Sequence, residues 1–274
     1  MTLQTLLKKA PITTLLLISF VGLYLIQLFT GVDANNPTSQ DLIHWGANAL
    51  PFTMIDEPWR LLTSAFLHIG LMHLIFNTFA MYFFGQVAEP MFGHAKFLAI
   101  FLLSAVGGTL LNNYVTWYAL INEGAQPGLS AGASGGIMGI GGALLVGALF
   151  KVAVGGLMLN LRSLVLIMGI NLVYGFAVPG IDNAAHIGGA ITGALLALPI
   201  ALAYRKQGLT VQPNAPYSPA AVSANGHGAN THNANNGIWQ LLPWLVIAAV
   251  TVAFYFCWLD IYQQIALHLK QLEA

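Results

Sequence analysis

The chain has 274 residues, of which 57% are hydrophobic and only 7% are charged, and its formal net charge is zero. Soluble domains carry about 25% charged residues, so this composition and the mean hydropathy of +0.73 exclude a soluble protein. The zero net charge argues against a nucleic-acid-binding surface, and the single cysteine, Cys257, excludes an internal disulfide framework.

Seven apolar stretches have roughly the 20 residues that a helix needs to cross a membrane. They predict an all-α, multi-pass membrane protein with six spans in one block and a seventh set apart. In chain order the expected spans are 12–29, 65–88, 97–119, 132–150, 162–178, 185–204 and 239–258. The first span follows Lys8 and Lys9, and its apolar core is longer than that of a signal peptide, so we expect it to be retained.

The basic residues predict the orientation of these spans. Most of them fall on alternate loops, counting the N-terminus as a loop, and the positive-inside rule places such loops in the cytoplasm. They are Lys8, Lys9, Lys96, Lys151, Arg162, Arg205 and Lys206. Most acidic residues lie on the opposite loops, where Arg60 and Lys270 are the basic exceptions. We therefore expect a cytoplasmic N-terminus and, after an odd number of spans, an external C-terminus.

Two connections are too long to be simple turns. Residues 30–64 form an external loop with apolar and aromatic residues of its own, which predicts short amphipathic pieces lying in the membrane interface. Residues 207–237 are polar and rich in Asn, Ala and Gly, which predicts a flexible cytoplasmic linker. We expect no metal site at His227 and His232 in this linker, because neither cysteine nor carboxylate accompanies them.

Polar side chains inside membrane spans are costly and tend to mark function. In the second span, His73 and Asn77 are four residues apart and share one helix face. On the same helix His68 would point about 140° away from His73, so we expect it to hold the external loop. The alternative is that all three side chains only make hydrogen bonds between helices.

The fourth and sixth spans each combine one polar residue with glycines. Ser134 lies between Gly132 and Gly135, and Gly141 is seven residues further along the same face. In the sixth span His186 is followed by two glycines close to its face, Gly189 and Gly193. Small residues let helices approach closely, so we expect these two glycine stripes to pack on each other. The alternative is ordinary small-residue packing with an incidental Ser and His.

The topology brings these polar residues to one depth. The second, fourth and sixth spans all run inward, and His73, Asn77, Ser134 and His186 lie in or just beyond their first turns. A polar cavity open to the external side explains this coincidence. It would hold a nucleophile, Ser134, a base, His186, and oxyanion donors from His73, Asn77 and the Ser134 amide. Asp182 is expected in a loop, so the sequence predicts a Ser–His dyad without a third member.

The same residues carry a resemblance to the rhomboid intramembrane serine proteases. The matching pieces are "WR" at Trp59–Arg60, "HIGLMHLIFN" at 68–77, "GQVAEPMFGHAKF" at 85–97, "GASG" at 132–135 and "AHIGGAITG" at 185–193. They occur in the order of that family and on its spans, over residues from about 12 to 204. The seventh span resembles the 6+1 arrangement of many members.

The resemblance implies a rhomboid-like bundle whose shortened fourth helix starts at the floor of a water-filled cavity. Ser134 and His186 would be catalytic, and Gly132 and Gly135 would let the backbone approach substrate. Four residues after the serine, Met138 replaces an aromatic residue that packs on the catalytic histidine in many rhomboids. The thioether of Met138 can still contact an imidazole ring.

The resemblance also assigns structural roles around that cavity. Arg60, next to Trp59, and His68 would help to hold the external loop 30–64, and Glu89 would anchor the inner end of the second span to a neighbouring loop. The fifth span and the loop 175–184 would form the gate and cap for substrate entry.

The implied function is hydrolysis of peptide bonds in or near transmembrane segments of membrane proteins, without a metal or cofactor. The partners would be transmembrane substrates and the lipid bilayer, in a prokaryotic plasma (inner) membrane with the active site on the external side. Residues 1–206 would form the catalytic domain, and residues 238–274 would add a packing helix and a short external tail. The alternatives are an inactive rhomboid-like binder of transmembrane clients and a transporter, although the internal repeats typical of transporters are not evident.

Overall fold

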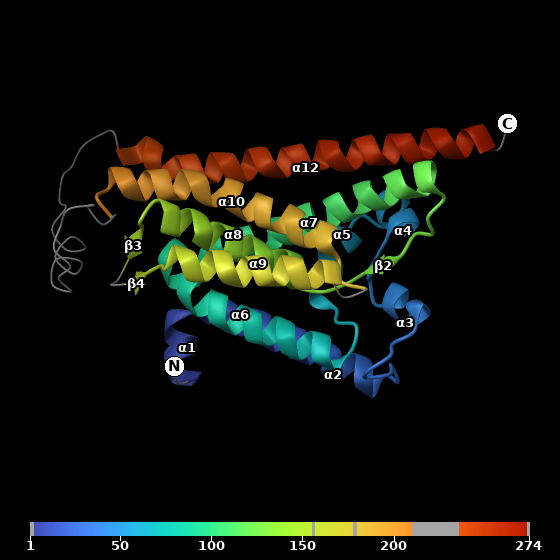
Figure 1. The fold of residues 1–274 in the computed structure, drawn as a ribbon, viewed down its shortest axis with the longest axis horizontal. Coiled ribbons are helices and arrows are strands. Elements are labelled where there is room, and N and C mark those ends of the chain that lie inside the picture. The colour runs from blue at the N-terminus through green and yellow to red at the C-terminus, as the bar shows by residue number, and fades with distance from the viewer. Residues whose placement is uncertain (1–2, 155–156, 178–179, 210–235, 273–274) are drawn as a thin grey trace.

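The chain folds as an all-α membrane protein, whose computed structural model describes residues 3–154, 157–177, 180–209 and 236–272. The long helices are α2 (Pro11–Phe29), α6 (Leu71–Phe92), α7 (His94–Glu123), α8 (Ser134–Leu149), α9 (Leu161–Ala177), α10 (Asn183–Lys206) and α12 (Asn236–Leu272). The short elements are α1 (Leu3–Lys9), α3 (Ser39–His44), α4 (Leu50–Ile55), α5 (Arg60–Thr63), the 3-10 turn η1 (Ser64–Phe66), and the strands β1 (Asn48–Ala49), β2 (Leu129–Ser130), β3 (Ala153–Val154) and β4 (Leu157–Met158). The long helices run roughly along one axis of the molecule (Figure 1).

The expected number of spans is matched only in part. Five described helices, α2, α6, α7, α10 and α12, are long and apolar enough to cross a membrane. The helices at the expected fourth and fifth spans, α8 and α9, have 16 and 17 residues and are shorter than that. The exact 6+1 arrangement is therefore not established by helix length, although the all-α membrane class is confirmed.

The second span begins later than expected. The sequence predicted a helix over 65–88, but α6 starts at Leu71 and continues to Phe92 through Pro90. The break comes at Gly70, whose φ of +95° favours glycine, and a Cβ there would lie 2.9 Å from the carbonyl oxygen of Asn35. His68 therefore precedes the helix, and its predicted direction relative to His73 on a common helix was wrong.

Helix α8 forms the centre of the bundle and is buried along most of its length. It packs against α10 and α7, and its contact with α10 is a backbone contact at glycines. A Cβ on Gly189 would lie 2.0 Å from the carbonyl oxygen of Gly135, and a Cβ on Gly193 would lie 1.8 Å from that of Gly139. The close approach of α8 and α10 thus depends on glycine at these positions.

One glycine of the predicted stripe faces another helix. A Cβ on Gly141 would lie 2.2 Å from Sδ of Met168 on α9, so Gly141 packs against α9 and its assignment to the α10 contact was wrong. Gly142 serves that contact, since its Cβ would lie 2.3 Å from the carbonyl oxygen of Ala190. At about 100° per residue, Gly135, Gly139 and Gly142 lie roughly 80–140° around α8 from Ser134, whereas Gly141 lies only about 20° from it, so the α10 contact uses a face of α8 next to the predicted one.

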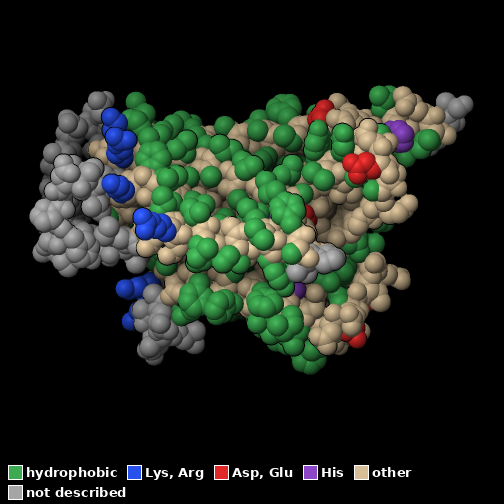
Figure 2. Space-filling model, in the orientation of Figure 1, with side chains coloured by type: hydrophobic (Ala, Val, Ile, Leu, Met, Phe, Trp, Pro, Cys, Tyr) green, Lys and Arg blue, Asp and Glu red, His purple; other side chains and the backbone are tan. Residues whose placement is uncertain are grey.

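Charged side chains separate along the long axis of the molecule. On the face shown in Figure 2, Lys and Arg side chains gather at the end near α1 and β3, whereas Asp and Glu side chains lie toward the end with α3 and α4. Apolar side chains cover the surface between them (Figure 2). This separation is what we expect if the helices cross a bilayer, with basic loops on one side of it and acidic loops on the other.

The C-terminal helix is longer than expected. The sequence predicted a span over 239–258 and a short tail, but one helix, α12, covers Asn236–Leu272. The predicted linker 207–237 lies mostly outside the described residues, as do His227 and His232. Lys206 at the end of α10 approaches Trp239 of α12, with Nζ 5.6 Å from the ring centroid, so the two helices meet again after the linker.

Candidate active site

Ser134 is the first residue of α8, and the preceding backbone holds it in place. Strand β2 pairs with β1 just before this point, with Ser130 opposite Asn48. The N–H of Gly132 then donates to the carbonyl oxygen of Ser64 at 2.9 Å, and Gly132 has a φ of +139° that favours glycine. The first N–H groups of a helix have no partner within the helix, so Ser134 lies among backbone donors suited to an anion.

The ring of His73 lies directly against Gly132. A Cβ on Gly132 would be 2.6 Å from Cε1 and 2.8 Å from Nε2 of His73, and 3.8 Å from Oγ of Ser134. The N–H of Ile69 donates to Nδ1 of His73 at 3.3 Å, so the neutral ring carries its proton on Nε2. Glycine at position 132 thus makes room for a ring N–H donor beside the serine.

Asn77 lies one turn further along α6 and is buried. Its amide donates one hydrogen bond, 2.9 Å long, to the carbonyl oxygen of His73. A carboxamide has two N–H donors, so one contact of this kind leaves capacity for a second. The structure therefore places Asn77 next to His73, as its spacing predicted.

His186 occupies the first turn of α10, whose N-cap is Asp182. The Asp182 carboxylate accepts hydrogen bonds from the Ala185 N–H at 2.8 Å and from the Ser130 hydroxyl. The glycine contact between Gly135 and Gly189 sets this turn of α10 against the turn of α8 that carries Ser134. His186 is 8% exposed, and its Nδ1 has no hydrogen-bond partner among the described residues.

The water-filled cavity predicted around these residues stays a prediction. Gly135 and Met138 are buried, and Met138 belongs to the main apolar core. A small pocket nearby lies between α2 and the following loop, with Tyr24, Asp33 and His68 among its lining residues. Ser134 and His186 do not line that pocket, and Ser134 is half-buried.

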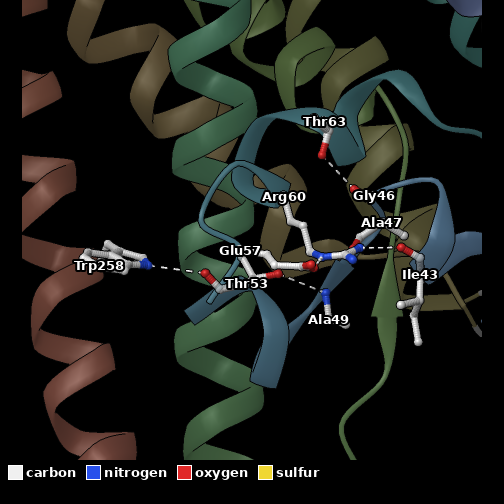
Figure 3. Close-up of polar contacts among 9 residues, drawn as sticks. All are labelled: Ile43, Gly46, Ala47, Ala49, Thr53, Glu57, Arg60, Thr63 and Trp258. Atoms are coloured by element: carbon white, nitrogen blue, oxygen red, sulfur yellow. Dashed lines mark hydrogen bonds and ion pairs between the residues drawn. The ribbon is translucent and has the colours of Figure 1, made fainter. Parts of the chain in front are cut away.

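The external loop is held mainly by Arg60. This side chain is buried, donates to the carbonyl oxygens of Ile43 at 2.7 Å and Ala47 at 2.9 Å, and pairs with Glu57 (Figure 3). The five donors of a guanidinium suit it to such a multiple contact. Its neighbour Trp59 is 55% exposed, and the structural role expected of it stays a prediction.

His68 contributes by packing. It is 2% exposed, and its ring centroid lies 5.4 Å from those of both Phe20 and His73. Neither ring nitrogen has a hydrogen-bond partner among the described residues. His68 therefore fills the space between α2 and the turn before α6, beside loop residues such as Asp33, and its role in holding the loop stays a prediction.

Glu89 anchors the inner end of α6, although its partner differs from the one expected. It is fully buried and accepts hydrogen bonds from the N–H groups of Ile12 at 2.9 Å and Thr13 at 2.7 Å, and from the Thr13 hydroxyl. It also contacts Nδ1 of His94 at 2.6 Å. Glu89 thus anchors α6 mainly to the first turn of α2, where an acidic side chain complements the free N–H groups.

Several polar residues near the site were missed from the sequence. Asn48 of β1 exchanges side-chain hydrogen bonds with Asn112 and Asn113 of α7, at 2.9 and 3.0 Å. Two adjacent asparagines inside an apolar span were the available signal. The bond from Ser130 to Asp182 had no such signal, because the partners are 52 residues apart. Among the described residues, no group of three or more His, Cys, Asp or Glu side chains is placed to hold a metal ion.

Comparisons with known proteins point to one family. Residues 56–203 match the model of the rhomboid domain. The chain is 31% identical over 208 residues to Rhomboid protease AarA of Providencia stuartii, covering 70% of this chain and 73% of that protein. It is 36% identical over 197 residues to Rhomboid protease GluP of Bacillus subtilis (strain 168), covering 69% of this chain but only 36% of that protein.

A plant relative extends this similarity. The chain is 30% identical over 240 residues to RHOMBOID-like protein 1 of Arabidopsis thaliana, covering 86% of this chain and 56% of the relative. The chain therefore spans about a third of the length of GluP and little more than half of the plant protein.

Proposed function

Because the chain belongs to the rhomboid family, we propose that it is an intramembrane serine protease that hydrolyses peptide bonds in or near transmembrane segments of other membrane proteins. The observation that carries this proposal is the position of Ser134 at the start of α8, beside the His73 ring and on the turn that packs against the turn bearing His186. This juxtaposition depends on Gly132, which makes room for the His73 ring, and on the close contact of Gly135 with Gly189.

The proposed reaction proceeds through an acyl-enzyme. His186 takes the proton of Ser134 as Oγ attacks the carbonyl carbon, and the carbonyl oxygen becomes an oxyanion. The Ser134 N–H, Nε2–H of His73 and an Asn77 N–H stabilise that charge. The C–N bond then breaks, and His186 gives its proton to the leaving amine. Water, activated by His186, hydrolyses the ester and restores Ser134.

Substrate would enter beside α9. This helix packs on α8 and α10, whereas α6 and α9 make no extended contact among the described residues. Its outward side chains include Val173 and Phe176, which are 70% and 75% exposed. The loop 175–184 belongs to the same proposed gate, and its residues 178–179 lie outside the described part of the chain. A substrate helix must unwind before its carbonyl can reach Ser134, which favours segments with Gly or Pro.

The chain is an integral membrane protein, and the charge separation supports its proposed orientation. The basic end would face the cytoplasm together with the N-terminus, and the end with α3 and α4 would face outward. Ser134 and His186 begin α8 and α10 at the outward ends of these helices, so the active site would open to the external side. The prokaryotic plasma (inner) membrane remains the proposed location.

Covalent labelling tests the proposed function against the alternative of an inactive client-binding relative. The full chain in lipid nanodiscs is treated with a fluorophosphonate, and the modified residue is identified by mass spectrometry. We expect labelling at Ser134 because a nucleophilic serine with a base reacts with such reagents. Folded protein without label at Ser134 would favour the binder.

Asn77→Ala is expected to lower kcat by about 10²–10³-fold with little change in KM, because one oxyanion donor is lost. Cleavage of a fluorogenic transmembrane substrate measures both constants. Asn122→Ala is a suitable control, because Asn122 makes the same kind of bond to its own helix, at the exposed end of α7 and away from the proposed gate. Unchanged kcat in Asn77→Ala would show that Asn77 only stabilises α6.

A further inference from the structure

Helix α12 is longer than a membrane crossing requires. Its 37 residues extend over about 55 Å, whereas a bilayer core is about 30 Å thick. The composition changes within the helix, since Asp260, Gln263, Gln264, His268 and Lys270 all follow Trp258. The C-terminal part, residues 258–272, therefore runs past the apolar crossing and along the end of the molecule that carries α4 (Figure 1).

This C-terminal part packs on the external loop. Ile261 and Ile265, one turn apart, are 3% and 5% exposed. They form an apolar cluster with residues of α4 and α7, namely Leu50, Met54, Leu110 and Trp117. By contrast, few residues of α12 within the apolar crossing are buried. The best-buried part of α12 is thus the part that meets α4.

Hydrogen bonds reinforce the apolar contact of α12 with both of its partners, α4 and α7. Nε1 of Trp258 donates to the carbonyl oxygen of Thr53 in α4 at 3.3 Å (Figure 3). Nε1 of Trp117 at the outer end of α7 donates to Oε1 of Gln264 at 3.1 Å, and the Trp117 ring meets His268 edge-on. Indole N–H groups are directional donors, so the Trp258 bond fixes where α4 lies along α12, and the Trp117 bond fixes where the outer end of α7 lies along it.

Thr53 connects this contact to the catalytic serine. Its hydroxyl accepts a hydrogen bond from the Ala49 N–H at 3.1 Å, and Thr53 is fully buried (Figure 3). Ala49 lies in β1, which pairs with β2 at Leu129. The chain reaches Ser134 only five residues after Leu129. Displacement of α4 would therefore move β1, β2 and the backbone that positions Ser134.

We propose that residues 258–272 of α12 form a positioning clamp, which holds α4 and, through the β1–β2 pair, the backbone at Ser134. This inference rests on the proposed protease function and extends it to a helix outside the rhomboid-domain match at 56–203. The packing role expected from the sequence is too narrow, because that expectation treated the residues after 258 as a tail. Trp258 and Gln264 are positioning residues that do not touch substrate.

The test uses the full chain in lipid nanodiscs. The polar contacts are removed in Trp258→Phe/Gln264→Leu and the apolar contact in Ile261→Ala/Ile265→Ala. Trp258→Phe alone is a milder variant in case a double variant does not fold. Trp244→Phe is the matched control, because Trp244 lies on the same helix and is 44% exposed. Hydrogen–deuterium exchange is followed in residues 48–55 and 129–132, together with kcat, KM and the rate of fluorophosphonate labelling.

We expect amide exchange in both segments to accelerate by roughly tenfold in the polar variant, since each lost hydrogen bond shifts the opening equilibrium by about twofold to tenfold. Small displacements of a catalytic group are costly, so kcat and the labelling rate should fall by roughly tenfold while KM stays unchanged. Trp244→Phe should match the wild type in every measurement.

Two results would overturn the clamp. Unchanged exchange in residues 48–55 would show that α12 does not hold α4. Faster exchange with unchanged kcat and labelling would show that α12 stabilises the loop without positioning Ser134. A wild-type protein that is not labelled at Ser134 would instead contradict the proposed function, and with it the catalytic role of the clamp, while the exchange data would still decide whether α12 holds α4.

Discussion

Ser134→Ala and His186→Ala are each expected to abolish cleavage of a transmembrane substrate, lowering kcat by about 10⁴-fold or more. The serine supplies the attacking oxygen and the histidine moves its proton, so neither residue can act without the other. The double variant should therefore be no worse than either single variant. Turnover of a fluorogenic transmembrane peptide in nanodiscs measures this, and circular dichroism checks that each variant is folded.

Two substitutions outside the site serve as controls for the loss of activity. Ser19→Ala removes a hydroxyl that bonds only within α2, and His44→Ala removes a histidine at the end of the surface helix α3. Both variants should retain wild-type turnover. Substantial activity in purified Ser134→Ala, or additive losses in the double variant, would rule out the proposed pair.

Gly193→Ala is expected to destabilise the bundle, and Gly193→Leu to prevent its assembly. The added Cβ would lie 1.8 Å from the carbonyl oxygen of Gly139 and 2.6 Å from its Cα, so the backbones of α8 and α10 would have to separate. Overpacking of this kind costs about 1–3 kcal/mol or more. Activity should fall as well, because Gly193 belongs to the same α8–α10 interface as the Gly135–Gly189 contact, which sets His186 against Ser134. Thermal unfolding in detergent measures the loss of stability as a lower Tm.

Gly22→Ala is the matched control for Gly193→Ala. Gly22 also lies within a membrane helix, α2, but a Cβ there would have no heavy atom within 4 Å. Alanine is better than glycine inside a helix by about 0.5–1 kcal/mol, so this variant should be as stable as the wild type or slightly more stable. Equal Tm values for Gly193→Ala and Gly22→Ala would contradict the proposed importance of the α8–α10 contact.

Local sequence pattern was sufficient for the features that depend on composition and helical period. The low charge and the apolar stretches predicted an all-α membrane protein because a bilayer leaves few ways to bury backbone polar groups. The four-residue spacing of His73 and Asn77 predicted their contact, and the polar residues at the starts of alternate spans predicted one common depth. Ser134 and His186 were selected by the same argument, and their catalytic roles remain proposals.

Only the tertiary structure decided which partners meet at each position. Glu89 was expected to hold a loop, but it binds the first turn of α2, and Gly141 was expected to face α10, but it faces α9. Such choices depend on the rotation and axial offset of packed helices, and neither follows from the period of one helix. The contact between Trp258 and Thr53 joins residues 205 positions apart, so no local pattern could reveal it. The sequence by itself thus determined which residues are polar, small and embedded in the membrane, whereas the packing of α8, α10 and α12 determined what those residues contact.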